Sequence, residues 1–169
     1  MKKVLFILCG VLFFATSCLN VGPSSGSSSV SYDGRLVVTD LQTDEVTYSD
    51  DKAQVVVTIP NVLEPKFDIR FNGIKFSAMM PKLNIDVLGI PFTTTISEDE
   101  TSINYVFDAH NLVPEVGGIE YQKFKIDRIW GQVGRTVEIL FTMESKGSKV
   151  HFTSSTTSSE GSNEQDAME

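Results

Sequence analysis

The chain has few of the residues from which catalytic and metal sites are built. Its 169 residues include two cysteines, two histidines and one tryptophan. No Gly-x-Ser-x-Gly elbow, phosphate-binding loop or His-Glu-x-x-His pair is present, and His110 and His151 belong to no known motif. We therefore expect no enzyme activity, no cofactor and no bound metal. Paired carboxylates that meet only in the folded chain would leave no sequence signal, so an enzyme stays a third hypothesis.

The acidic run at residues 97–101 is the segment of the chain that most resembles a calcium-binding loop. It contains Glu98, Asp99 and Glu100, but it lacks the alternating oxygen ligands and the central glycine of such a loop. A solvated hairpin tip is the better interpretation.

Positive charge is also scarce. The chain has 14 Lys and Arg against 22 Asp and Glu, for a net charge of -8. Removal of residues 1–17, which include Lys2 and Lys3, would leave 12 basic and 22 acidic residues. Such a surface repels phosphate backbones and anionic headgroups. We expect no nucleic acid partner and no electrostatic docking to a membrane.

Long apolar runs are missing as well, because residues 4–15 are too few to cross a bilayer as a helix. Following Lys2 and Lys3, this run predicts an export signal over residues 1–17. The sequence Ala15-Thr16-Ser17-Cys18 resembles the lipobox of bacterial lipoproteins, which implies acylation of Cys18 and cleavage before it. The alternative is a soluble secreted protein that is cut near Ala15 to Ser17.

Cys18 is then the only thiol of the mature chain, because Cys9 leaves with the signal peptide, and no intramolecular disulfide can form. The partner predicted first is a membrane, reached through the acyl chains, each buried methylene of which contributes about 0.8 kcal/mol. No acidic run follows Cys18, so we expect the periplasmic face of the outer membrane, with the cell surface as the alternative.

Composition divides the remaining chain into three parts. Residues 18–30 are rich in serine and glycine and predict a flexible tether. Residues 153–169 form a tail of serine, threonine and acidic residues without an aromatic side chain, which predicts disorder. Residues 31–152 have the length of a single domain.

This domain alternates apolar and polar residues with period two, which predicts strands. The clearest case is residues 67–71, with Phe67, Ile69 and Phe71 on one face. Asn72-Gly73 predicts a hairpin turn, residues 145–148 predict the last turn, and residues 108–121 could hold a short helical turn before Pro114. The fold class is therefore all-β: about 8–10 antiparallel strands in one up-and-down barrel.

Several segments resemble the calycin-like β-barrel lipoproteins of Gram-negative bacteria. They are Tyr32-Asp33-Gly34-Arg35-Leu36-Val37-Val38, Phe71-Asn72-Gly73-Ile74-Lys75-Phe76, Met79-Met80-Pro81 and Leu83-Asn84-Ile85. The resemblance covers most of residues 32–152. It implies a lipocalin-like barrel whose interior holds one small apolar ligand, and it carries over no catalytic residue.

The candidate ligand pocket consists of large side chains expected inside such a barrel: Phe71, Phe76, Tyr105, Arg128, Trp130 and Phe141. Alternation places Arg128 and Trp130 on one face, where the guanidinium either stacks on an aromatic ring to close a barrel end or anchors the anionic group of an amphiphile. Ile129 on the opposite face could instead mark a bulge that reverses this assignment.

Two non-enzymatic functions follow from these patterns. The first is a lipoprotein that binds a small apolar or amphiphilic ligand in its barrel. The alternative is a protein-interaction module with a filled barrel, part of an envelope complex or a protease inhibitor, which presents loops such as residues 108–122. Large inward side chains favour the filled barrel, because they could occupy an eight-stranded interior completely.

Overall fold

A computed structural model describes residues 28–59, 64–96 and 102–155. The predicted signal peptide at residues 1–17, the acylated Cys18, the acidic run at 97–101 and the tail beyond residue 155 lie outside these residues. None of the helices in the described part of the chain has the length and apolar character needed to cross a bilayer.

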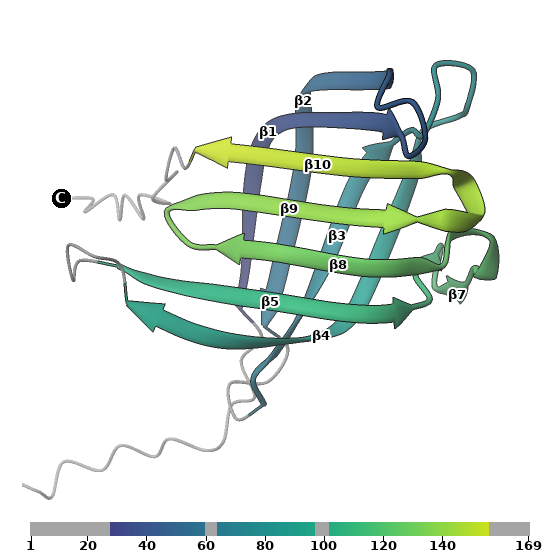
Figure 1. Ribbon diagram of the computed structural model, residues 1–169. Coiled ribbons are helices and arrows are strands. Elements are labelled where there is room, and N and C mark those ends of the chain that lie inside the picture. The colour runs from purple at the N-terminus through teal and green to yellow at the C-terminus, as the bar shows by residue number, and fades with distance from the viewer. Residues whose placement is uncertain (1–27, 60–63, 97–101, 156–169) are drawn as a thin grey trace, which may run out of the picture.

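The chain folds into a closed antiparallel barrel of eight strands, and a small hairpin is added to its wall (Figure 1). Each barrel strand pairs with the next one along the chain, and β1 pairs with β10 to close the barrel. This confirms the all-β, up-and-down barrel and is consistent with a calycin-like fold. The barrel strands are β1 (Ser28–Asp40), β2 (Val46–Ile59), β3 (Lys66–Ile74), β4 (Leu83–Ile96), β5 (Ile103–Leu112), β8 (Ile126–Val133), β9 (Thr136–Met143) and β10 (Ser148–Ser155).

Alternation along the strands separates the core from the outer surface. In β3, Phe67, Ile69 and Phe71 are fully buried, while Asp68 and Arg70 between them point outward. This confirms the pattern expected for residues 67–71. Each apolar side chain that leaves water contributes roughly 1.5–3 kcal/mol, so the inward rows supply most of the stabilising free energy.

The two ends of the barrel differ in the residues that border them, and we call them the rim end and the plugged end. The rim end carries the start of β1, the end of β4, the start of β5 and the end of β10. The plugged end is closed by an aromatic stack in which Phe124 lies 5.1 Å from both Phe76 and Tyr121. Lys146 Nζ lies 5.0 Å from the centroid of the Phe124 ring, which adds a cation–π contact.

The Asn72-Gly73 pair does not form the predicted hairpin. Both residues lie inside β3, and the register to β4 shifts between Phe71 and Ile74, which is a β-bulge. Gly73 has a φ of +66°, and its N–H donates to Asn84 Oδ1 at 2.9 Å. One kind of β-bulge places a glycine at positive φ, as a tight hairpin turn does, so the dipeptide signal is shared by both structures. The predicted turn at 145–148 is confirmed, with Gly147 in the left-handed region.

Residues 108–121 contain no helical turn, so that prediction was wrong. β5 continues through Leu112, and a short hairpin follows, made of β6 (Glu115–Val116) and β7 (Ile119–Glu120). The two 3-10 turns lie elsewhere, at η1 (Gln122–Phe124) and η2 (Glu144–Lys146). The pair Gly117-Gly118 turns the β6–β7 hairpin with φ of +64° and +80°, and this turn chemistry outweighs the weak helical pattern.

The strands extend past both predicted limits of the domain. β1 begins at Ser28, within the range assigned to the tether, because residues 28–30 pair with residues 57–59 of β2. Ser29 Oγ lies 2.8 Å from Thr58 Oγ1. β10 ends at Ser155 rather than at residue 152, and the buried Ser154 hydroxyl donates to the carbonyl oxygen of Asp33. Serine-rich composition predicted flexibility, but backbone pairing to a neighbouring strand orders these residues.

Candidate binding groove

Three of the six predicted pocket residues are packed core residues. Phe71 and Phe141 are each 1% exposed, and their ring centroids lie 5.2 Å apart in an edge-on contact. Phe76 is buried in the stack at the plugged end. Rings at this distance fill the space between opposite walls of the barrel. The structure brings these residues together, but as neighbours within the core.

Tyr105, the fourth, lies near the rim end. Its ring centroid is 4.9 Å from that of Phe92, and both side chains are half-buried. Phe92 in turn stacks on the buried Phe67 at 5.2 Å. Burial and the nearby Tyr105 raise the pKa of the Tyr32 phenol above its ordinary value. The rings of Tyr105, Phe92 and Phe67 therefore pack against one another inside the barrel near the rim end.

Arg128 and Trp130 lie on the outer wall, which corrects their predicted inward placement. Ile129, between them, is fully buried, whereas Arg128 is exposed. The buried Ile126 lies three residues before Ile129, so strict alternation fails in β8. This irregular step places Ile129 inside and Arg128 outside, which is the reversed assignment considered for a bulge at Ile129. The Arg128 guanidinium carbon is 4.7 Å from the centroid of the Trp130 ring, so the predicted stacking exists but does not close the barrel.

Asp108 of β5 fixes Arg128 in this position. Arg128 donates from Nε to Asp108 Oδ1 at 3.0 Å and from its terminal nitrogen to Oδ2 at 2.7 Å. This fork lowers the pKa of the Asp108 carboxyl. With its charge paired on the outer wall, Arg128 is not available as an anchor for a ligand inside the barrel.

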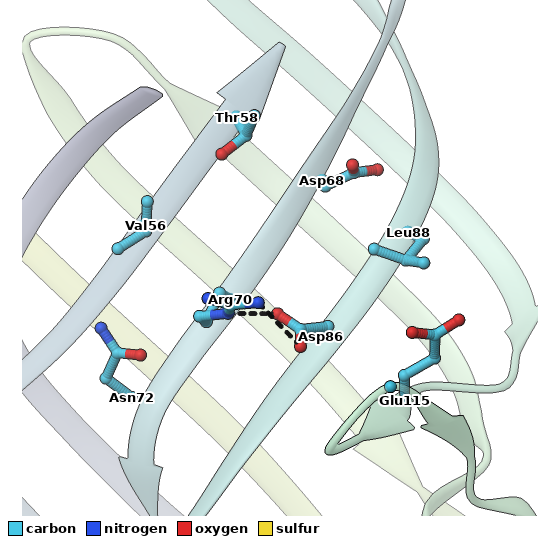
Figure 2. A pocket seen from close by; sticks show the side chains of 9 residues that line it. Val56, Thr58, Asp68, Arg70, Asn72, Asp86, Leu88 and Glu115 are labelled. Carbon is cyan, nitrogen blue, oxygen red and sulfur yellow. Dashed lines mark hydrogen bonds and ion pairs between the residues drawn. The ribbon is translucent and has the colours of Figure 1, made fainter. Parts of the chain in front are cut away.

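A groove of about 430 Å³ lies on the outer wall over β2, β3 and β4 (Figure 2). One row of cross-strand partners forms its centre, because Val56 pairs with Arg70, Arg70 with Asp86, and Asp86 with Glu115. The β6–β7 hairpin supplies Glu115 and Gly118, so it adds a fourth element to the groove. The remaining lining residues are Thr58, Asp68, Asn72 and Leu88.

The Arg70–Asp86 pair is the best-defined contact of the groove. Arg70 donates from Nε to Asp86 Oδ1 at 2.5 Å and from its terminal nitrogen to Oδ2 at 3.2 Å, as the dashed lines in Figure 2 show. These hydrogen bonds, and the attraction of the two charges, raise the pKa of Arg70. Two guanidinium nitrogens of Arg70 face the two carboxylate oxygens of Asp86. This bidentate contact orients both side chains although Arg70 is exposed.

Asp68 is held by the backbone of β4. Its Oδ1 accepts from the N–H of Gly89 at 2.7 Å. Gly89 has a φ of +67° and lies in a stretch where the β3–β4 register shifts between Phe67 and Ile69. The positive φ explains glycine at this position, since an L side chain would be strained there. The bulge thus turns a backbone donor toward the groove and orients the carboxylate.

The charges of the groove do not balance. Asp68, Asp86 and Glu115 contribute three carboxylates against the one guanidinium of Arg70, which Asp86 already engages. The aliphatic side chains of Val56 and Leu88 lie on the same wall. The arrangement suits a ligand with both a cationic group and apolar stems. Among the described residues, no group of three or more His, Cys, Asp or Glu could hold a metal ion.

Sequence reasoning missed this groove. Alternation did place Asp68 and Arg70 on the outer face, but outward charges on a strand are usually only solvated. The pairing of Arg70 with Asp86 depends on the β3–β4 register, which the misassigned Asn72-Gly73 turn would have set differently. Glu115 reaches the row through a hairpin that was expected as a helical turn. The usable signal was the segment 108–122, already singled out as an interaction loop, which carries the hairpin.

Comparison with known proteins does not assign the chain to a family. The chain matches no protein-family model, no curated protein and no solved structure.

Proposed function

We propose that this protein is a non-enzymatic, lipid-anchored binding protein of the cell envelope, and that its outer groove binds a basic segment of a protein partner. The observation that carries the proposal is the row Val56–Arg70–Asp86–Glu115, which crosses four strands and leaves a net negative charge in a concave surface.

The groove fits the side chain of a lysine or an arginine. Arg70 is neutralised by Asp86, so Asp68 and Glu115 supply the unbalanced negative charge. Lysine and arginine pack their methylene stems on apolar surface and keep the charged head in a polar environment. Val56 and the exposed Leu88 offer that apolar surface beside the two carboxylates. A chain with few basic residues of its own also attracts a cationic partner over longer distances.

The packed interior supports an exterior site over a ligand inside the barrel. Phe71 and Phe141 touch across the core, and Phe67 contacts both Phe92 and Phe107 at 5.2 Å. A ligand between these rings would have to displace them, at a cost comparable to that of overpacking a core.

The anchor belongs to the same proposal. Acylation of Cys18 would hold the barrel at the outer membrane, on its periplasmic face, and no described residue is needed for that attachment. Cys18→Ser is expected to remove palmitate labelling and to move the protein from the membrane fraction to the soluble fraction. An unlabelled wild-type protein would rule out the lipid anchor and would leave the groove untouched.

The groove is tested with a fluorescent nine-residue peptide of alternating lysine and alanine. The double variant Asp68→Asn, Glu115→Gln removes two charges and keeps the side-chain volumes, and the amide oxygen introduced at position 68 could still accept from the Gly89 N–H. We expect it to weaken peptide binding about tenfold at low salt, measured by fluorescence anisotropy.

The matched control is Asp33→Asn, Asp51→Asn, which removes the same charge from β1 and β2 outside the groove. It is expected to weaken binding less than twofold. If the two double variants weakened binding equally, the attraction would be nonspecific. If neither did, the groove would not be the site.

A further inference from the structure

Outward side chains change from basic to acidic along β4. The buried Ile85 and Val87 point into the core, so the residues that alternate with them lie on the outer wall. In order from the plugged end, these residues are Lys82, Asn84, Asp86 and Leu88. Lys82 precedes Asp86 by four residues, which is about 13 Å along an extended chain. A lysine therefore lies on the same wall as the groove, toward the plugged end.

Lys82 has only a weak partner among the described residues. A Cβ added at Gly73 of β3 would lie 3.3 Å from Lys82 Cδ, so the stem of the lysine passes beside this glycine. Lys82 Nζ is 4.0 Å from Asp50 Oδ2, and 64% of the lysine side chain is exposed. Such an exposed ion pair contributes little free energy. Lys82 can therefore exchange Asp50 for the carboxylates of a partner.

Lys75 and Met79 extend this basic region. Ile74 pairs with Leu83, so Lys75 and Lys82, each one residue nearer the plugged end, lie at the same level. Met79, in the loop between the two lysines, is 98% exposed. We call Lys75, Met79 and Lys82 the basic edge. It combines cationic groups with an apolar side chain, and this is the combination that suits the groove.

We propose that the protein partner of the groove is a second copy of this chain, an inference that rests on the groove function proposed above. The basic edge of each copy binds in the groove of the other. Two facing walls can be related by a two-fold axis that runs across the strands, midway between the basic edge and the groove. This axis brings Lys75 toward Asp68 of the other copy. It brings Lys82 toward Leu88 and Glu115 of the other copy.

The placement of both surfaces on one wall favours a closed dimer. Each contact occurs twice across a two-fold axis, so a self-complementary wall forms a pair of copies and does not extend into a fibre. Arg70 keeps its bond to Asp86, and the two lysines balance the remaining carboxylates of the groove. The dimer also covers Met79 and Leu88, which are 98% and 45% exposed in the single chain.

The test uses residues 18–169 with Cys18→Ser, so that neither acyl chains nor a disulfide between copies contributes. Sedimentation equilibrium measures the dissociation constant of the dimer. Lys82→Glu and Glu115→Lys are each expected to raise this constant at least about tenfold, because each change creates two like-charge contacts per dimer. An equimolar mixture of the two variants should return to within about threefold of the unmodified wall, because each reversed charge then meets an opposite charge on the other copy.

The matched control is Lys149→Glu, which makes the same change of charge on β10, outside the groove and the basic edge. It is expected to change the dissociation constant less than about twofold. Equal weakening by Lys82→Glu and Lys149→Glu would contradict the contact between the basic edge and the groove. Oligomers larger than a dimer would contradict the two-fold arrangement.

Competition by a peptide keeps the test decisive where a variant does not fold. The lysine–alanine peptide should raise the dissociation constant of the unmodified dimer at least about tenfold, because it occupies both grooves, and a glutamate–alanine peptide of equal length should not. A dimer that binds the lysine–alanine peptide without dissociating would overturn the self-recognition. A chain that stays monomeric and binds the peptide would overturn this inference alone. A monomeric chain that does not bind the peptide would overturn the proposed groove as well.

Discussion

Two arginines on the outer wall each hold an aspartate of a neighbouring strand. Arg70 engages Asp86 and Arg128 engages Asp108, both through two nitrogens. Arg70 lines the groove, whereas Arg128 stacks on the ring of Trp130. The same local geometry therefore occurs in different surroundings. The charge of the neighbouring side chains, rather than the arginine–aspartate pair itself, distinguishes the proposed binding surface.

The Asp108 carboxyl predicts a pH-dependent stability. The hydrogen bond from Arg128 lowers its pKa below the ordinary value of 3.8, so the stabilisation is fully present above that pH. It is lost as the pH falls through the lower pKa of the folded state. Asp108→Asn should therefore be less stable than the wild type at pH 7, and the difference should shrink below pH 3.8. Urea midpoints at pH 7 and pH 3 check this, and a difference that grows at pH 3 would contradict the pairing.

A second prediction at this scale concerns the core. Phe141→Ala removes a ring that is 1% exposed and contacts Phe71. We expect it to lower the free energy of unfolding by about 3–5 kcal/mol. Val106→Ala, on the outer face, should cost less than about 0.5 kcal/mol. Urea titration measures both, and a small loss for Phe141→Ala would mean that the interior is loosely filled.

At the scale of elements, glycines mark where the strands depart from regular pairing. Gly73 and Gly89 lie at the two register shifts between β3 and β4, and the second shift orients Asp68 in the groove. Local sequence indicated positive φ at Gly73 but could not distinguish a turn from a bulge. The choice depends on which residues of β4 lie opposite, and that is a property of the pair of strands.

Gly131 of β8 gives an element-scale prediction. It has a φ of +147°, and an added Cβ would lie 2.0 Å from the Glu138 carbonyl oxygen of β9. Gly131→Ala should cost at least about 3 kcal/mol, because the clash adds to the backbone strain. Gly147→Ala, at a φ of +58° with open space around it, should cost about 1–2 kcal/mol. Thermal unfolding compares them, and equal losses would mean that β8 and β9 are less closely apposed than described.

At the scale of the whole molecule, the barrel could be predicted and the groove could not. The period-two pattern of Phe67, Ile69 and Phe71 depends only on residues that are neighbours in the sequence, and so does the turn at Gly147. Both could therefore be predicted. Local sequence left the placement of Arg128 and Trp130 open between the two faces, because one irregular step between Ile126 and Ile129 reverses a face. Likewise, the row from Val56 to Glu115 requires the registers of three strand pairs at once.

The packed barrel also changes what the single tryptophan can report. Trp130 lies on the outer wall under Arg128, so its fluorescence follows that contact rather than the occupancy of the interior. Ligand entry into the barrel has to be followed at buried positions such as Phe71, Phe141 or Ile139.

The central claim is that the barrel is filled and that recognition takes place on its outer wall. Amide chemical shifts in NMR spectra test it most directly, with laurate and the lysine–alanine peptide titrated in parallel. We predict that the peptide shifts the amides of Arg70, Asp86 and Gly118, and that laurate leaves those of Phe71 and Phe141 unchanged. Saturable shifts at Phe71 and Phe141 with laurate, without any at the groove with the peptide, would mean that the barrel is hollow and that the groove is not the binding site.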